Sequence, residues 1–176
     1  MNTEKKIEEI GGIEITPAFE SKKDNNIDVD NYLKLNDLKL PDAYINFSLK
    51  YGFGQFNNDI VFKSIDKIPV GYDDGTTPIT FIYGWGSGGE SLQETRISLT
   101  DQISSNYFVF AEGNPGDYLL INTVDGKIYY YAHEGAINNS FFLVADSFQQ
   151  FIESLLINEN SNSEDDLEEE WFSDDF

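Results

Sequence analysis

The chain has 176 residues and no cysteine, and its 32 aspartates and glutamates against 11 lysines and arginines give a net charge of −21. This length fits a single domain with a sizeable core, and the lack of cysteine excludes a disulfide framework. So negative a chain is repelled by nucleic acid and by anionic membranes and attracts basic proteins. No charged-then-apolar leader and no apolar run of transmembrane length is present, so we expect a soluble, cytoplasmic protein.

The first clear element along the chain is a helix that begins near Leu40-Pro41-Asp42. Proline suits the first helical position and aspartate suits the first turn. Tyr44, Phe47 and Tyr51 then fall on one face, and Gly52 ends the helix. Three weaker segments come before it: a short helix over 3–10, a polar loop over 16–26 and a helix over 29–38.

Short apolar runs after this helix predict an antiparallel sheet. The glycine-rich segment 84–89 predicts a loop, because four glycines in six residues weaken any regular element. Asp125-Gly126 marks a tight turn between two strands. The predicted strands are 59–65, 79–83, 107–111, 118–122, 127–132 and 141–144.

A closing helix is the strongest pattern in the chain. Asp146 and Gln149 fit a capping box at its start. One core-facing stripe follows at helical spacing, formed by Phe148, Phe151, Ile152, Leu155 and Leu156. We expect the helix to pack on a sheet face that holds Phe108, Phe110, Leu120 and Ile128. Residues 158–176 contain nine acids and no base, which predicts a solvated tail after a domain over 1–157.

Signals for catalysis are sparse. His133 is the only histidine, so a histidine-based metal site has no partner residues, and no serine lies in a nucleophile-elbow sequence. Acids are abundant, but none has neighbours that single it out as a catalytic group. The sequence therefore predicts no enzymatic activity, no metal and no cofactor.

Two motif matches are weak. Gly84-x-Gly86-x-x-Gly89 resembles a dinucleotide fingerprint, but only about two helical turns fit after it and Trp85 would crowd the phosphates. Asp24-x-Asn26-x-Asp28 opens like a calcium loop, yet it lacks the glycine and the final glutamate of that loop. Ordinary loop roles account for both segments.

The acidic field suggests a surface that binds a basic partner. Trp85 is either a core anchor that folds its glycine loop back or an exposed hot spot for that partner. Acids near predicted loops and strand ends complete the candidate surface: Asp73, Asp74, Glu90, Glu112, Asp117 and Glu134. The tail is either a solubilising segment or an acidic-aromatic docking peptide.

Five motifs in order make the chain resemble the SUKH superfamily. They cover about residues 40–157, and each is weak alone. The matching segments are Leu40-Pro41 with Lys50–Gly54, Phe81–Trp85, Phe110–Asn114 with Gly116-Asp117, Gly126–Glu134, and Ala145–Phe151.

The resemblance implies an α+β fold with a strongly bent, mostly antiparallel sheet, helices packed against it and a C-terminal helix closing the core. It also implies a bacterial immunity protein that neutralises a toxin, often a nuclease. A scaffold or regulatory module, like the fungal cell-wall regulator of the superfamily, is the alternative. The chain departs from the pattern in its long segment before Leu40 and at Phe53, which replaces a glycine.

Overall fold

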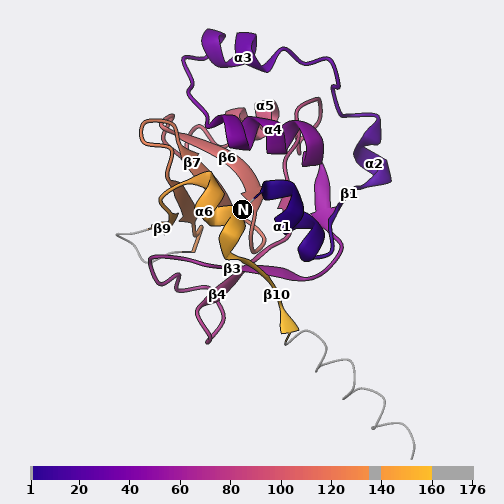
Figure 1. The fold of residues 1–176 in the computed structure, drawn as a ribbon. Coiled ribbons are helices and arrows are strands. Elements are labelled where there is room, and N and C mark those ends of the chain that lie inside the picture. Colours follow the sequence, from indigo (N-terminus) through magenta and orange to yellow (C-terminus); the bar gives the residue numbers. More distant parts are fainter. Residues whose placement is uncertain (1, 135–139, 160–176) are drawn as a thin grey trace, which may run out of the picture.

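The computed structural model describes residues 2–134 and 140–159 (Figure 1). Its helices are α1 (Thr3–Glu9), α2 (Pro17–Glu20), α3 (Val29–Leu35), α4 (Asp42–Tyr51), α5 (Leu92–Ser98) and α6 (Phe148–Ser154). Its strands are β1 (Ile13–Ile15), β2 (Gly54–Phe56), β3 (Ile60–Lys63), β4 (Thr76–Ile79), β5 (Phe81–Ile82), β6 (Tyr107–Glu112), β7 (Tyr118–Asn122), β8 (Ile128–Tyr131), β9 (Phe141–Ala145) and β10 (Leu155–Ile157). The predicted α+β class is confirmed.

The strands form two antiparallel sheets. The larger has the order β1-β2-β5-β6-β7-β8-β9, and the smaller has the order β10-β3-β4. Backbone bonds join them, because Ile65 and Asp66, which follow β3, donate to Val144 and Leu143 on the outer edge of β9. That edge of the larger sheet is therefore covered by the chain itself.

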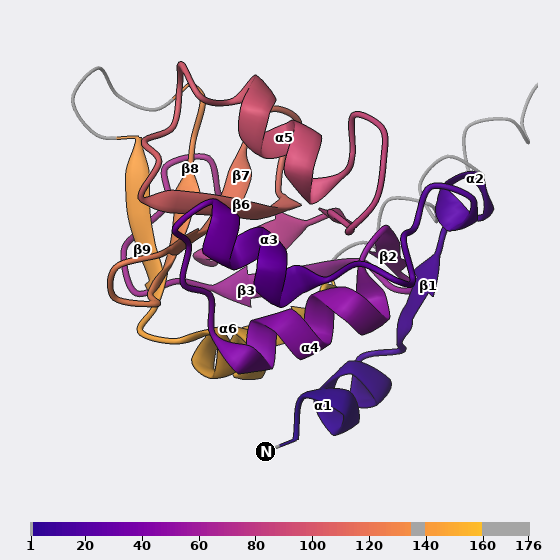
Figure 2. The ribbon, with the colours of Figure 1, turned by 90° about the horizontal axis from the view of Figure 1, so that it is seen from above.

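Helices α4 and α6 pack against one face of the larger sheet, which we call the inner face. Tyr44 on α4 makes edge contacts with Phe108, Phe110 and Phe148, with ring centroids 6.1, 5.6 and 5.4 Å away. Such aromatic pairs add stabilisation beyond the area they bury. In the view from above, α5, α3 and α4 follow one another from the top of the picture downward, and α6 and α1 lie below α4 (Figure 2).

The closing helix is shorter than predicted and is capped one residue later. Ser147 is the N-cap, since its hydroxyl accepts from the Gln150 N–H, while the Gln150 side chain accepts from the Asp146 N–H. Asp146 instead forms an ion pair with Lys127. The helix ends at Ser154, and the chain continues in extended form as β10 along β3.

The predicted strand 79–83 is wrong, because the chain changes sheets within it. Ile79 ends β4 in the smaller sheet, and Phe81 begins β5 in the larger one. Between them, the backbone N–H of Thr80 donates to the Glu112 carbonyl, and its hydroxyl donates to the Gly113 carbonyl. One continuous apolar run therefore contributes a strand to each of the two sheets.

Leu120 lies on the face opposite to the one predicted. It is fully buried, but it pairs with Val109 and Tyr129, while Phe108 pairs with Ile121. Side chains alternate between faces along a strand, so this register puts Leu120 on the outer face. The rest of the expected inner face, including Phe110 and Ile128, packs as predicted in the core.

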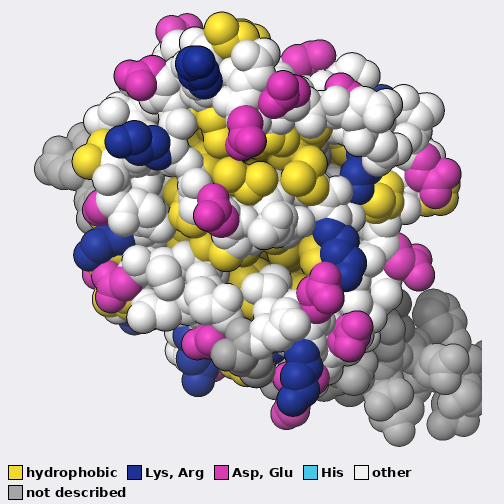
Figure 3. All heavy atoms as spheres, turned by 45° about the horizontal axis from the view of Figure 1, so that its top comes forward, with side chains coloured by type: hydrophobic (Ala, Val, Ile, Leu, Met, Phe, Trp, Pro, Cys, Tyr) yellow, Lys and Arg dark blue, Asp and Glu magenta, His cyan; other side chains and the backbone are white. Residues whose placement is uncertain are grey.

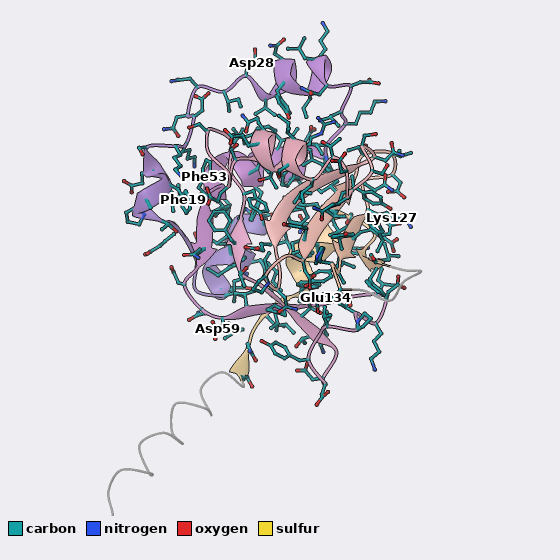
Figure 4. All side chains as sticks on the ribbon, turned by 180° about the vertical axis from the view of Figure 1, so that it is seen from behind. Phe19, Asp28, Phe53, Asp59, Lys127 and Glu134 are labelled. Carbon is teal, nitrogen blue, oxygen red and sulfur yellow. The ribbon has the colours of Figure 1, made fainter. Side chains whose placement is uncertain are left out.

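The segment before residue 26 adds a strand and an aromatic contact to the domain. Strand β1 pairs with β2 at the end of the larger sheet. Phe19 on α2 stacks on Phe53, with centroids 5.7 Å apart and planes 11° apart (Figure 4). Phe53 has a φ of 63° and no exposed surface. At this position, where the resemblance leads one to expect glycine, the chain therefore combines a left-handed backbone conformation with a buried aromatic ring.

Candidate partner-binding surface

The outer face of the larger sheet carries a row of aromatic rings. The strand registers pair Tyr118 with Tyr131 and Tyr131 with Phe141, so these three share one face. Tyr129 lies two residues before Tyr131 on β8 and points the same way, and Tyr107 opposite Asn122 joins them. Tyr83 joins the row through Tyr118, with ring centroids 6.5 Å apart. We call Tyr83, Tyr107, Tyr118, Tyr129, Tyr131 and Phe141 the tyrosine row. Tyr83 and Tyr131 are buried beneath it, and the other four rings are partly exposed and form the part that a partner can touch.

The rings of the row touch one another in sequence. Tyr118 and Tyr131 are stacked with centroids 6.4 Å apart, and Tyr131 lies 5.2 Å from Phe141. Phe141 on β9 then stacks on Tyr107 of β6 at 4.9 Å, although β7 and β8 lie between these strands. The rings therefore converge above Leu120 and help to shield its side chain from solvent.

Two of the predicted acids stand beside one end of the row. Glu112 pairs with Tyr118 across β6 and β7. Burial raises the pKa of the Tyr83 hydroxyl, and the charges of Glu112 and, more weakly, Glu90 raise it further. The hydroxyls at this end therefore stay protonated and can donate hydrogen bonds, while the carboxylates supply negative charge.

The other predicted acids differ in their surroundings. Glu134 is exposed in the turn after β8, and Figure 4 labels it. Asp73 and Asp74 are exposed in the loop between β3 and β4, in the smaller sheet. The Asp74 carboxylate accepts from the N–H and the hydroxyl of Thr76, and these bonds lower its pKa. Glu90 forms an ion pair with Lys22 at 3.5 Å.

Trp85 and Asp117 belong to the interior. Trp85 is 2% exposed, and its indole N–H donates to the Ser48 hydroxyl at 2.8 Å. Asp117 is 6% exposed and accepts from the Tyr130 hydroxyl and the His133 N–H. A partner cannot reach either side chain in this conformation. We therefore withdraw both from the candidate surface, and Trp85 is the core anchor of its loop.

The glycine loop around Trp85 owes its composition to close backbone contact. Ser87 donates to the Lys22 carbonyl, and Asp24 donates to the Trp85 carbonyl, so the loop lies against the segment after α2. A Cβ atom on Gly86 would collide with the Lys22 carbonyl oxygen, whereas one on Gly89 would meet no atom within 4 Å. Backbone packing accounts for Gly86 without any phosphate.

Gly86→Ala is expected to lower the free energy of unfolding by about 1–3 kcal/mol, the usual range for an added methyl group that forces the backbone to shift. Gly89→Ala is the matched control, and its effect should stay within about 0.5 kcal/mol. Urea denaturation of both variants measures the difference. Equal effects would contradict the packing explanation.

Metal and membrane features are absent from the part of the chain that the structure describes. No three histidine, cysteine, aspartate or glutamate side chains gather there in a way that could hold a metal ion. No described helix combines the length and hydrophobicity that a membrane crossing requires. Asp28 of the calcium-like segment caps α3 by accepting from the Asn31 N–H (Figure 4).

Comparison with known proteins identifies the family. The family model of SMI1 / KNR4 (SUKH-1) matches residues 26–154, from just before α3 to the end of α6. The chain belongs to the SUKH-1 family. A relative by sequence is the "SPbeta prophage-derived uncharacterized protein YokK" of Bacillus subtilis (strain 168), which is 29% identical over 129 residues, covering 67% of each chain. No solved structure gives a significant match.

The family match covers only part of the described domain of this SUKH-1 member. It begins at residue 26, so α1, β1 and α2 lie before it. The tyrosine row lies inside the matched range, although sequence reasoning assigned its strands only to the core. The signal that could have revealed it is the alternation at Tyr129, Tyr130 and Tyr131, where every second tyrosine must face away from the core.

Proposed function

We propose that this protein is a cytoplasmic immunity protein that binds and neutralises a toxin through an acidic, tyrosine-bearing surface. Family membership carries the proposal, since SUKH proteins are known as toxin immunity proteins. The net charge of −21 favours a basic toxin, and nucleases are basic where they bind their substrate. The proposal assigns the chain no catalytic step.

The tyrosine row is the surface that best suits this role. Tyrosine and phenylalanine are enriched at protein interfaces, because rigid rings with a polar tip lose little entropy on binding. Glu112 and Glu90 at one end, with Glu134 after β8, would face basic groups on the toxin. Asp73 and Asp74 would add to the long-range attraction rather than to the contact.

A growth assay tests the proposal. The toxin domain encoded beside the gene of this protein is expressed alone and together with it, and co-expression is expected to restore growth. If growth is not restored while the protein binds a resident protein of its own cell, the regulatory role within the same family takes its place.

Charge reversal tests the acidic surface. Glu112→Lys with Glu134→Lys is expected to slow association with that toxin by about tenfold, because electrostatic steering raises association rates by 10 to 10³. Salt should slow the wild-type association in the same way, since the Debye length falls from about 10 Å at 0.1 M to about 3 Å at 1 M. Stopped-flow mixing measures both.

The control for this pair is Glu8→Lys on α1. Glu8 is exposed, and α1 packs against α6, which lies on the inner face of the sheet. Glu8→Lys changes the net charge by as much as Glu112→Lys or Glu134→Lys alone, but at a position far from the tyrosine row. Equal slowing by Glu8→Lys and Glu112→Lys would mean that the total charge, and not this face, guides the toxin.

A further inference from the structure

A hollow on the helical side of the molecule has no place in the function proposed above. It lies between the start of α3 and the outer side of α4 and has a volume of about 640 Å³. Figure 3 shows hydrophobic side chains gathered in this region with acidic side chains beside them. Its lining is Asn26, Ile27, Asp28, Val29, Asp30, Asp42, Ile45, Asn46 and Leu49.

Part of the floor of this groove is apolar because α4 has a second stripe. One side of α4 buries Tyr44 and Phe47 in the core. The other side presents Asp42, Ile45 and Leu49 at spacings of three and four residues, which places them in one line. Leu49 is 40% exposed, and Ile45 beside it is partly buried against the core, so α4 leaves part of this apolar strip open to solvent.

The charged residues at the rim of the groove are all acidic. Asp28, Asp30 and Asp42 are exposed, and the lining contains no lysine or arginine. Within residues 2–134 and 140–159, none of these three carboxylates forms an ion pair. By contrast, the hollows beside α1 contain both signs, with Lys50 paired to Glu4 in one and Lys6 near Glu9 in the other.

The charge decides what can occupy the groove. The tail of this chain carries nine acids and no base, and a second copy brings a net charge of −21, so the rim repels both. A segment with basic side chains on one face and apolar side chains on the other would satisfy rim and floor together. An amphipathic helix has these two faces, and helix binding in an apolar groove is a recurrent mode of recognition.

We propose that the groove between α3 and α4 binds a basic, amphipathic helical segment of a partner protein. Apolar residues of that helix would contact Ile45 and Leu49, and its lysines or arginines would pair with Asp30 and Asp42. This surface lies on the helical side, apart from the tyrosine row on the outer face of the sheet. It can therefore be occupied whether or not a toxin binds that row.

A synthetic peptide tests the groove without any toxin. The probe is a fluorescent leucine–lysine peptide of about 18 residues, enough for about five helical turns, with leucines at helical spacing. A peptide of the same composition with scrambled spacing separates the helical pattern from charge alone. Fluorescence anisotropy at near-physiological salt measures both affinities, and the patterned peptide is expected to bind more tightly.

Matched variants locate the site. The groove variant Asp30→Lys with Leu49→Lys should weaken binding of the patterned peptide by about tenfold or more, because it sets like charges against the peptide. The control, Asp101→Lys with Ile97→Lys, makes the same charge change at exposed positions on and after α5, and should weaken binding less than twofold. All four positions are exposed, so both variants should fold.

Three results would overturn the proposal. Equal weakening by the groove and control variants would mean that the peptide responds only to total charge. Loss of binding with Glu112→Lys, but not with the groove variant, would place the peptide on the tyrosine row. Self-association that Leu49→Lys abolishes, measured by sedimentation, would make a second copy the occupant. The growth assay for immunity is independent of all three.

Discussion

Replacing Phe151 with alanine is expected to lower the free energy of unfolding by about 3–5 kcal/mol, the range for a fully buried phenylalanine. Phe151 on α6 is 1% exposed, and its ring centroid lies 5.6 Å from Phe110 in the larger sheet and 5.7 Å from Phe62 in the smaller one. The ring joins both sheets to the closing helix. Its loss leaves a cavity where these three elements meet, and chemical denaturation measures the cost.

Ile157→Ala is the control for this substitution. Ile157 lies six residues further along the chain on β10, but it is 45% exposed, so its truncation should cost less than about 1 kcal/mol. If both variants lost equal stability, α6 would not be docked between the sheets.

The periodic parts of the fold could be predicted from sequence, and the ends of its elements could not. The stripe of Phe148, Phe151 and Ile152 gives the inner face of α6 directly, because spacing alone determines which side chains share a helix face. The end at Ser154 depends on β3, whose edge offers Leu155–Ile157 the hydrogen bonds of a strand. Such a long-range competitor leaves no local signal in the sequence.

Register limits prediction of the sheet in the same way. The alternation of Phe108 and Phe110 indicates that they share a face, but which face of β7 meets them depends on strand pairing. An irregularity between Val109 and Ala111 shifts that pairing within β6. Leu120 pairs with Val109 just before this irregularity and so lies on the face of the tyrosine row, whereas sequence alone assigned it to the opposite side.

For the candidate surface, the sequence reveals the charge of a residue but not its burial. Charge is readable from the sequence, so acids such as the partly buried Glu112 and the exposed Glu134 could be named as candidates. Burial is not, and Asp117 resembles any loop acid until its bonds to Tyr130 and His133 are seen. The groove could not be predicted either, because Ile45 and Leu49 lie beside the core-facing Tyr44 and Phe47 on α4, and spacing alone does not show which of these side chains remain exposed.

Phe53→Gly is expected to destabilise this protein by about 1.5–5 kcal/mol. A φ of 63° favours glycine by about 1–2 kcal/mol. Against this gain stands the loss of a fully buried phenylalanine ring, about 3–5 kcal/mol, and the extra chain entropy of glycine, about 0.5–1 kcal/mol. The ring stacks on Phe19, in the segment that precedes the family match, so packing outweighs backbone strain.

Asp37→Gly is expected to change stability in the opposite direction, although Asp37 has a similar backbone conformation. Asp37 has a φ of 50° and follows α3 in a turn where the Leu38 N–H donates to the Leu33 carbonyl, the position at which helices favour glycine. Its side chain is exposed, so glycine should stabilise the protein by up to about 1 kcal/mol. Thermal unfolding of both variants measures the contrast. If Phe53→Gly also stabilised the protein, the Phe19–Phe53 contact would contribute nothing to stability. The segment before residue 26 would then be held by its other contacts, among them the pairing of β1 with β2 and the bonds to the glycine loop.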